Sequence, residues 1–345
     1  MTLLIVFLSL GIFLLTHLLV PLNIRLSKRF GILALPNERK IHTQAIPEAG
    51  GLSFALPMML AQLVLGLTLL PDLSGRMMLQ LAGVEAIALI LGVMDDHHDS
   101  RAGLKLLFQT LIGVVMYAIG FRVVSLTNPF GAEIVLYWAS FPVTLLWYLV
   151  VMNAVNLIDG IDGLASGICV IVCAVLLSVG VKEHNLLVTA LSAFLLAGNL
   201  AFLRFNFHPA KIFLGDTGSL FNGLVIAAIS TAGTQQYKGI TSMTLIIPLS
   251  VLAIPLIDTA LAVFRRLRLG NIFIADKAHL HHAMLGLGLS QKAIALTAYV
   301  VTLLFGLIAI GFSFSTKRIL FSVLFGLLVL GVILAYVLMR HGRKK

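Results

Sequence analysis

Long apolar runs separated by short polar stretches dominate the pattern of the chain. Runs of roughly 20 residues, long enough as helices to cross about 30 Å of hydrocarbon, recur along its whole length. Hydrocarbon does not tolerate unpaired backbone groups, so each such run is expected to be a helix. We predict an all-α polytopic membrane protein, with one integral membrane domain over residues 1–345 and about eleven transmembrane helices. These helices are expected at 2–22, 50–70, 79–95, 104–120, 141–157, 163–181, 186–203, 218–234, 243–263, 293–313 and 318–339.

Composition agrees with this pattern and excludes a water-soluble fold. Hydrophobic residues make up 59% of the chain and charged residues only 11%, whereas soluble domains carry roughly 25% charged residues. The net charge of +10 is assigned to membrane topology, so no nucleic-acid partner is expected. Cys169 and Cys173 share one apolar run and are interpreted as packed thiols. The first run starts at Thr2 with no basic segment before it, and we expect a retained span rather than a signal peptide.

The distribution of bases predicts the orientation. Most of the 24 Lys and Arg fall in the loops after spans one, three, five, seven and nine and in the C-terminal tail. The positive-inside rule places these segments in the cytoplasm and the N-terminus outside. The polar cytoplasmic loops are then expected at about 23–49, 95–103, 156–163, 204–217 and 264–292. One outside loop, 121–140, has two β-prone runs around Asn128–Gly131 and predicts a small periplasmic β-hairpin.

Acidic residues gather on the side where bases are expected. Most of the 14 Asp and Glu lie in the predicted cytoplasmic loops, and carboxylates beside hydrocarbon require a counter-charge such as a divalent cation. The first cluster, Asp95 and Asp96, ends the third span, although alone such a pair is also typical of a solvated helix end. Oxygen ligands favour Mg²⁺, or Mn²⁺, over zinc.

The second cluster is spaced for one helical face. Asn156, Asp159 and Asp162 are three residues apart, so they share a face while the helix lasts, and Gly160 and Gly163 are expected to end or bend it.

The third cluster, at 215–219, is Gly-Asp-Thr-Gly-Ser and opens the eighth span. Its N–H groups would hold phosphate and its carboxylate a metal, while a plain N-cap is the alternative.

The last polar stretch combines arginines with histidines. Arg265 begins a run of bases that alone is also typical of a topological anchor, and His279, His281 and His282 follow. Together they would hold phosphate oxygens. The first cytoplasmic loop, from Pro36 to Gly51, adds bases that would guide an anionic substrate or contact anionic lipid.

These five stretches together resemble the polyprenyl-phosphate N-acetylhexosamine-1-phosphate transferases of glycosyltransferase family 4, with motifs in the family's order over about 36 to 290. The ending at 279–282 resembles the WecA-type branch, which starts O-antigen and related glycans. The resemblance implies a catalytic Mg²⁺ held by Asn156 and Asp216. It implies catalytic roles for Asp95, Asp96 and His279. The substrate-binding residues that it implies are Asp159, Asp162, Lys105, Arg265, His281 and His282.

The same resemblance implies the reaction. N-acetylhexosamine 1-phosphate, first of all GlcNAc 1-phosphate, would pass from a UDP-sugar to undecaprenyl phosphate, with release of UMP, at the cytoplasmic face of a bacterial inner membrane. The product would start lipopolysaccharide O-antigen or a related cell-surface glycan. UDP-MurNAc-pentapeptide or another UDP-N-acetylhexosamine remains an alternative donor, and a homodimer remains open. An ion-coupled transporter is the non-enzyme alternative, but it would require acids at mid-span, where only Glu85 and Asp258 fit.

Overall fold

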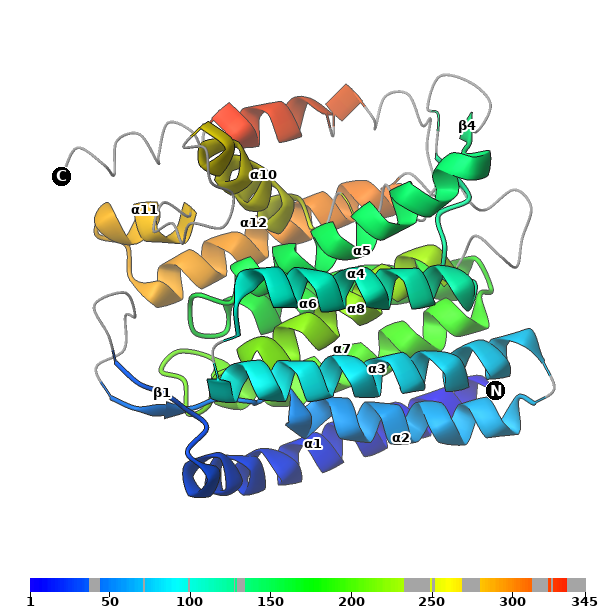
Figure 1. The fold of residues 1–345 in the computed structure, drawn as a ribbon, viewed down its shortest axis with the longest axis horizontal. Helices are drawn as coiled ribbons and strands as arrows, with labels where there is room; N and C mark the ends of the chain where they lie inside the picture. The colour runs from blue at the N-terminus through cyan, green and yellow to red at the C-terminus, as the bar shows by residue number, and fades with distance from the viewer. Residues whose placement is uncertain are drawn as a thin grey trace.

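The computed structural model describes residues 1–36, 44–70, 72–98, 100–126, 128, 134–232, 249, 252–268, 280–311, 322–323 and 325–333. In this part of the chain, long helices lie side by side in a bundle (Figure 1). The first half has α1 (Thr2–Phe30), α2 (Leu52–Thr68), α3 (Leu73–His98), α4 (Ala102–Ala118), the short η1 (Tyr137–Ala139) and α5 (Ser140–Leu157). The second half has α6 (Leu164–Lys182), α7 (Leu186–Asn206), α8 (Gly215–Ala232), α10 (Ala253–Arg268), α11 (Leu280–Gly286) and α12 (Gln291–Gly311).

The prediction of an all-α polytopic membrane protein is confirmed. Six helices among the described residues are long and apolar enough to cross a membrane, namely α1, α3, α5 together with η1, α6, α7 and α12. The helices α2 and α4 are shorter apolar helices at two further predicted runs. The largest differences in extent are in α1, which continues to Phe30, in α3, which begins at Leu73, and in α10, which covers Ala253–Arg268 where 243–263 was predicted. The full number of spans, their orientation and the single-domain assignment stay predictions.

The central helix of the bundle is α8. Every residue from Thr217 to Ala232 is buried, and the helix packs against α3, α5 and α7. A helix that is apolar all round belongs in the interior. Close packing depends on glycines on both sides of the contact. A Cβ on Gly92 of α3 would lie 2.4 Å from the Cα of Thr217, and one on Gly223 would lie 2.6 Å from the Cα of Met152 on α5.

Buried polar side chains join these helices inside the apolar layer. Asn199 on α7 and Asn222 on α8 exchange two amide hydrogen bonds of 2.8 and 2.9 Å. Trp147 on α5 donates its indole N–H to Ser230, with a distance of 2.7 Å. Each such bond between membrane helices contributes about 1 kcal/mol. The bonds fix the register of α8 and therefore the position of its first turn, where the third acidic cluster lies.

Two short antiparallel β-pairs lie at opposite ends of the bundle (Figure 1). The strands β1 (Leu33–Ala34) and β2 (Ile46–Pro47) pair within the first polar loop, which the sequence analysis did not predict. The strands β3 (Ser125–Leu126) and β4 (Ile134–Val135) pair within the loop where a hairpin was predicted. Most of the turn between β3 and β4 lies outside the described residues, and its periplasmic location stays a prediction.

Candidate active site

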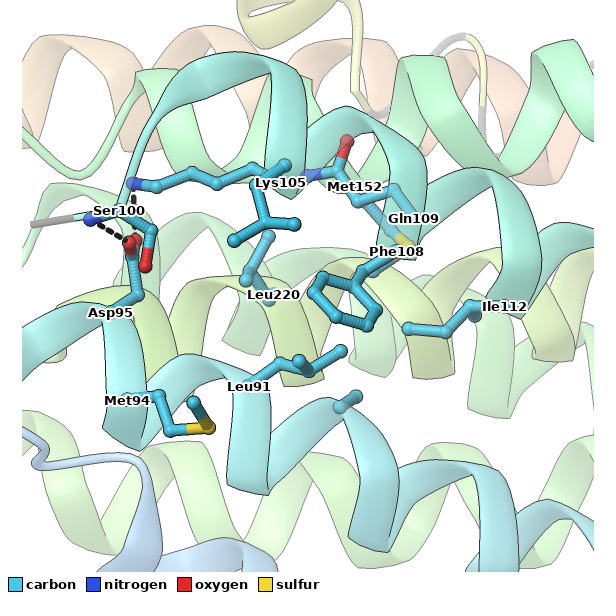
Figure 2. Close-up of a pocket in the computed structure, with 12 residues that line it drawn as sticks. Leu91, Met94, Asp95, Ser100, Lys105, Phe108, Gln109, Ile112, Met152 and Leu220 are labelled. Atoms are coloured by element: carbon cyan, nitrogen blue, oxygen red, sulfur yellow. Dashed lines mark hydrogen bonds and ion pairs between the residues drawn. The ribbon is translucent and has the colours of Figure 1, made fainter.

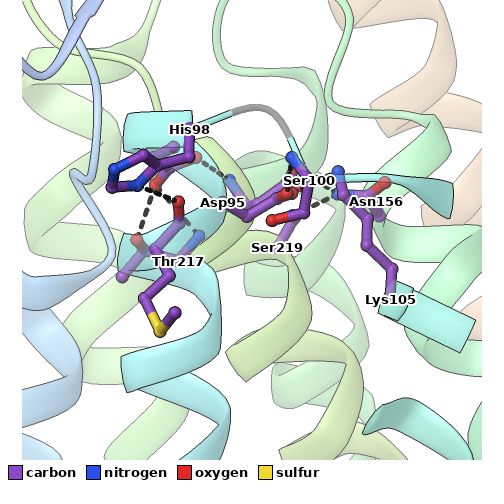
Figure 3. Close-up of polar contacts among 10 residues, drawn as sticks. Asp95, His98, Ser100, Lys105, Asn156, Thr217 and Ser219 are labelled. Carbon is purple, nitrogen blue, oxygen red and sulfur yellow. Dashed lines mark hydrogen bonds and ion pairs between the residues drawn. The ribbon is translucent and has the colours of Figure 1, made fainter. Parts of the chain in front are cut away.

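Residues from three of the predicted clusters meet where four helices begin or end. Asp95 lies near the end of α3, Lys105 in the first turn of α4, Asn156 in the last turn of α5 and Asp216 in the first turn of α8. Figure 3 shows Asp95, Lys105 and Asn156 converging. The bundle therefore brings together residues that are more than a hundred positions apart, as in the hydrogen bond from Lys105 to Asp216, which spans 111 positions.

The ammonium group of Lys105 lies between two carboxylates. It forms ion pairs with Asp95 and with Asp216, whose Oδ2 is 2.7 Å from the lysine Nζ. The backbone N–H of Ser100 donates to Oδ1 of Asp95 over 2.8 Å. Asp95 is buried, whereas the Lys105 side chain is 30% exposed. Two neighbouring carboxylates repel each other, and the partly exposed Lys105 ammonium offsets this repulsion.

Asn156 holds the other oxygen of Asp216. Its amide nitrogen donates to Oδ1 of Asp216 over 2.7 Å and to the hydroxyl of Ser219 over 2.9 Å. Both oxygens of the Asp216 carboxylate are thus fixed, one by Lys105 and one by Asn156. The two residues predicted to hold a metal are in direct contact with each other.

Asp96 makes different contacts from its neighbour Asp95. Its Oδ1 accepts the backbone N–H of Asp216 over 2.6 Å, and its Oδ2 accepts the N–H and the hydroxyl of Thr217 over 3.1 and 2.5 Å. A carboxylate at this place satisfies the unpaired N–H groups of α8 and interacts favourably with the helix dipole. We expected these N–H groups to bind phosphate. In the structure, the N–H groups of Asp216 and Thr217 instead donate hydrogen bonds to the Asp96 carboxylate.

The turn between α5 and α6 carries the next two acids. The helix α5 ends at Leu157, so the predicted helical face does not extend to Asp159 or Asp162. The Asp159 carboxylate accepts the backbone N–H of Gly215. Burial raises the pKa of Asp159 well above its usual value, and the nearby carboxylates of Asp96 and Glu48 raise it further. Its hydrogen bond from Gly215 connects the turn to the start of α8.

Asp162 fixes the loop between α7 and α8. Its Oδ2 accepts a hydrogen bond from Nδ1 of His208, 2.8 Å away, and another from the backbone N–H of Ala210, 3.0 Å away. Sequence analysis did not single out His208, although the residue falls within the predicted polar loop 204–217. The carboxylate that was expected to bind substrate thus also holds the loop that leads into α8.

For the remaining four predicted site residues, the described part of the structure does not include the side chains. The helix α10 carries Arg265, and α11 carries His281 and His282, at positions where only the helix is described. His279 lies outside the described residues. Their roles stay predictions.

An apolar pocket of about 50 Å³ adjoins Asp95 and Lys105 (Figure 2). Ser100 and these two residues form its polar end. Gln109 is a further polar residue of the wall, and its side-chain oxygen accepts a hydrogen bond of 2.6 Å from Asn153. The pocket thus has one charged end and apolar walls. Those walls are formed mainly by Leu91, Met94, Leu104, Phe108, Ile112 and Leu220.

Within the described residues, no group of three or more Asp, Glu, His or Cys side chains could hold a metal. Mg²⁺ usually takes only one or two carboxylates and completes its coordination with substrate phosphates and water. Asp216, which contacts Asn156, is a carboxylate of this kind. Magnesium binding at Asn156 and Asp216 stays a prediction, and oxygen ligands of this chemistry suit the ion.

Comparison with known proteins identifies the family. Residues 78–234 match glycosyl transferase family 4. A probable undecaprenyl-phosphate N-acetylglucosaminyl 1-phosphate transferase of Bacillus subtilis is 34% identical over 94% of this chain and 89% of its own length. A decaprenyl-phosphate N-acetylglucosaminephosphotransferase of Mycobacterium tuberculosis is 33% identical over 92% and 85%. An undecaprenyl-phosphate alpha-N-acetylglucosaminyl 1-phosphate transferase of Escherichia coli is 31% identical over 85% and 80%.

The chain is a multi-pass membrane protein of an enzyme family. It belongs to glycosyl transferase family 4, the polyprenyl-phosphate N-acetylhexosamine-1-phosphate transferases. The family resemblance of the sequence motifs is therefore confirmed, and the transporter alternative is set aside. The mid-span acid Glu85, on which that alternative relied, is buried and accepts a hydrogen bond of 2.9 Å from Gln62.

Proposed function

We propose that this protein transfers GlcNAc 1-phosphate from UDP-GlcNAc to undecaprenyl phosphate and releases UMP. The names of the relatives support the sugar and the type of lipid. One structural observation carries the proposal. The ion-paired cluster of Asp95, Lys105 and Asp216 lies at the charged end of an apolar pocket between membrane helices. Such a site suits an acceptor that has a phosphate at one end and a hydrocarbon chain behind it.

The acceptor phosphate would bind at Lys105. Its isoprenoid chain would enter the pocket from the bilayer and contact residues such as Leu104 and Phe108 of α4, which are among the pocket's lining residues. Lys105 is a compact positive charge that suits a phosphate oxygen. Because the pocket is lined mainly by apolar side chains, transfer of the hydrocarbon chain into it requires little desolvation of polar groups.

A divalent cation would be held by Asp216 together with Asn156. When bound, Mg²⁺ would offset the charge of the donor pyrophosphate and polarise its phosphoryl oxygens. Asp216 is suited to this role because Asn156 and Lys105 hold its two oxygens in one orientation. The start of α8 is held in turn by Asp96, so the metal ligand rests on a rigid helix end.

The reaction would be a single displacement. An oxygen of the lipid phosphate attacks the sugar-bearing phosphorus of UDP-GlcNAc. The bond from that phosphorus to the bridging oxygen breaks, and UMP leaves with the bonding electrons. A phosphate monoester is largely a dianion near neutral pH, with a second pKa of about 6, so it needs only weak activation. Asp95 would orient the attacking oxygen and accept the proton only from the fraction of lipid phosphate that is still a monoanion, and Lys105 would compensate the negative charge of carboxylate and phosphate.

We also propose the cellular setting. The site would face the cytoplasm of a bacterium, at its inner membrane, where nucleotide sugars are present. The product would be the first lipid-linked intermediate of O-antigen or a related cell-surface glycan. UDP-MurNAc-pentapeptide and other UDP-N-acetylhexosamines are the donors that compete with UDP-GlcNAc.

A donor panel tests the proposal. Purified protein in lipid nanodiscs is incubated with undecaprenyl phosphate, Mg²⁺ and one UDP-sugar at a time, and UMP is quantified. UDP-GlcNAc is expected to give the fastest UMP release, and release should require the lipid. Faster release with UDP-MurNAc-pentapeptide would replace the proposed donor. No UMP from any sugar, with protein that unfolds cooperatively on heating, would reject the transferase function.

A further inference from the structure

A tyrosine on α12 reaches the turn that carries Asp159 and Asp162. The hydroxyl of Tyr299 donates a hydrogen bond of 2.5 Å to the backbone carbonyl of Gly163, 136 positions earlier in the chain. Gly163 directly follows Asp162 and precedes the first residue of α6, with φ 75° and ψ −8°. The turn therefore ends in a left-handed residue whose carbonyl is held from another part of the chain.

The α6 helix is shaped to admit this tyrosine. A Cβ on Gly167 would lie 2.1 Å from both Cζ and the hydroxyl of Tyr299. A Cβ on Gly163 would lie 3.3 Å from the hydroxyl and 3.1 Å from the Cα of Phe207. Residues four apart on a helix lie on one face, so the two glycines form a slot for the tyrosine. In this slot the tyrosine hydroxyl lies at the N-terminal end of α6, beside the carbonyl of Gly163.

Other contacts tie the same turn to the α7–α8 loop. Asp162 accepts hydrogen bonds from His208 and from Ala210, and Asp159 accepts one from Gly215. Tyr299 adds a hydrogen bond to this turn from α12, which packs along α6. The turn is thus held on two sides by separate elements, and its conformation depends on both.

We propose that Tyr299 is a positioning residue for the donor end of the active site. Its hydroxyl fixes the α5–α6 turn, so that Asp159 and Asp162, to which the family resemblance gives substrate-binding roles, keep one orientation toward the UDP-sugar. This inference rests on the proposed function. The same hydrogen bond sets α12 in register with that turn. Loss of the hydroxyl should therefore weaken use of the donor and leave use of the lipid acceptor unchanged.

The test is Tyr299→Phe, which keeps the ring in its slot and removes only the hydroxyl. The KM for UDP-GlcNAc is expected to rise about 3- to 10-fold, the effect of losing one hydrogen bond. The kcat should stay within about 2-fold, and the KM for undecaprenyl phosphate should not change. Tyr117→Phe is the matched control. Tyr117 lies in the last turn of α4 against Phe141, whereas Lys105 of the active site lies in the first turn, so this variant should leave both KM values unchanged.

A second variant and a second readout separate positioning from folding. Gly167→Ala blocks the slot and should raise the same donor KM, and adding Tyr299→Phe to it should then raise that KM by less than the product of the single effects. Hydrogen exchange measured by mass spectrometry should increase in the peptide that covers 157–167 in Tyr299→Phe, and not in α1.

Two results overturn the proposal. One is an unchanged donor KM in folded Tyr299→Phe, and the other is equal changes in the KM values of donor and lipid. If the wild type releases no UMP with any sugar, the proposed function itself fails. The exchange experiment then decides on the tyrosine alone, because unchanged exchange in 157–167 would reject a positioning role and increased exchange would support it.

Discussion

Lys105 and Asp216 form an ion pair, with 2.7 Å between Nζ and Oδ2, that joins the first turn of α4 to the first turn of α8. The same ammonium contacts Asp95 at the end of α3. A single cation thus holds two carboxylates that would otherwise repel each other. The Asp95 and Asp216 carboxylates therefore depend on the Lys105 charge.

Lys105→Met should lower kcat/KM for undecaprenyl phosphate about 100-fold, the typical loss when a preorganised charge is removed from a transition state. Lys105→Arg keeps the charge and should recover part of the activity. Lys182→Met, at the end of α6, serves as the control for loss of a lysine. Steady-state kinetics with varied lipid give the values. Activity of Lys105→Met that matches the control would contradict a catalytic role for the ion pair.

Removal of Asp96 should lower the stability of the protein, whereas removal of Asp95 should abolish its activity. Asp96→Ala removes the acceptor for N–H groups at the start of α8, and loss of such a cap costs about 0.5–2 kcal/mol of the free energy of unfolding. Asp95→Ala should abolish turnover, because its oxygen lies at the proposed point of attack. Thermal unfolding in nanodiscs and UMP release are measured on both variants. Unchanged thermal stability of Asp96→Ala would reject its role as a cap.

Gly215→Ala should disrupt the same helix start. Gly215 has a φ of +71°, and an added Cβ would lie 2.5 Å from Oδ2 of Asp96. Alanine is therefore both strained at this position and in collision with the cap. Activity and thermal stability are both expected to fall. Gly83→Ala on α3 is the control, because an added Cβ there meets nothing within 4 Å. Equal behaviour of the two variants would contradict the proposed geometry.

The pH dependence of stability should reflect Asp159. Its pKa is raised in the folded state, so between the unfolded pKa of about 3.9 and the folded pKa only the folded protein binds the proton. Stability from this group is therefore complete below the unfolded pKa and is lost as pH rises to the folded pKa. Asp159→Asn cannot ionise and should lose less thermal stability than wild type as pH rises above the unfolded pKa. Parallel curves for the two proteins would contradict the assignment.

A narrower apolar pocket should weaken binding of the lipid acceptor and leave binding of the donor unchanged. Ile112 lines its wall on α4. Ile112→Phe adds volume there and should exclude part of the hydrocarbon chain. The KM for undecaprenyl phosphate should therefore rise by roughly 10-fold, which corresponds to about 1.4 kcal/mol of binding free energy. The KM for UDP-GlcNAc should stay the same. Kinetics with each substrate varied in turn distinguish the two. A selective rise in the donor KM would move the acceptor away from this pocket.

Much of the bundle could be predicted because long apolar runs permit few structures in a membrane. The predicted runs 50–70, 141–157 and 186–203 closely match α2, α5 and α7. The proximity of Asn156 and Asp216 also follows from the motifs of the family. Helix ends were less accurate for α1 and α3, which extend beyond the predicted spans. The end of α5 at Leu157 was predicted, and Asp159 and Asp162 lie beyond it in the turn rather than on its face.

Long-range contacts could not be predicted from residue patterns. Lys105 reaches Asp216 only because α4 begins beside the end of α3 and the start of α8. His208 and Tyr299 belong to no charged cluster, and their partners lie 46 and 136 positions away. Asp95 and Asp96 are adjacent, yet one contacts Lys105 and the other caps α8. The helical rotation between neighbours separates their roles, but the neighbouring helices decide which role each takes.

The most direct test follows the phosphorus of the donor. UDP-GlcNAc labelled with ³²P at the sugar-bearing phosphorus is incubated with the protein, undecaprenyl phosphate and Mg²⁺, and lipid and nucleotide are separated. The label is expected to move into the lipid, and the nucleotide product is expected to be unlabelled UMP. Label that stays with the nucleotide as UDP would show transfer of the sugar without its phosphate and would contradict the proposed reaction.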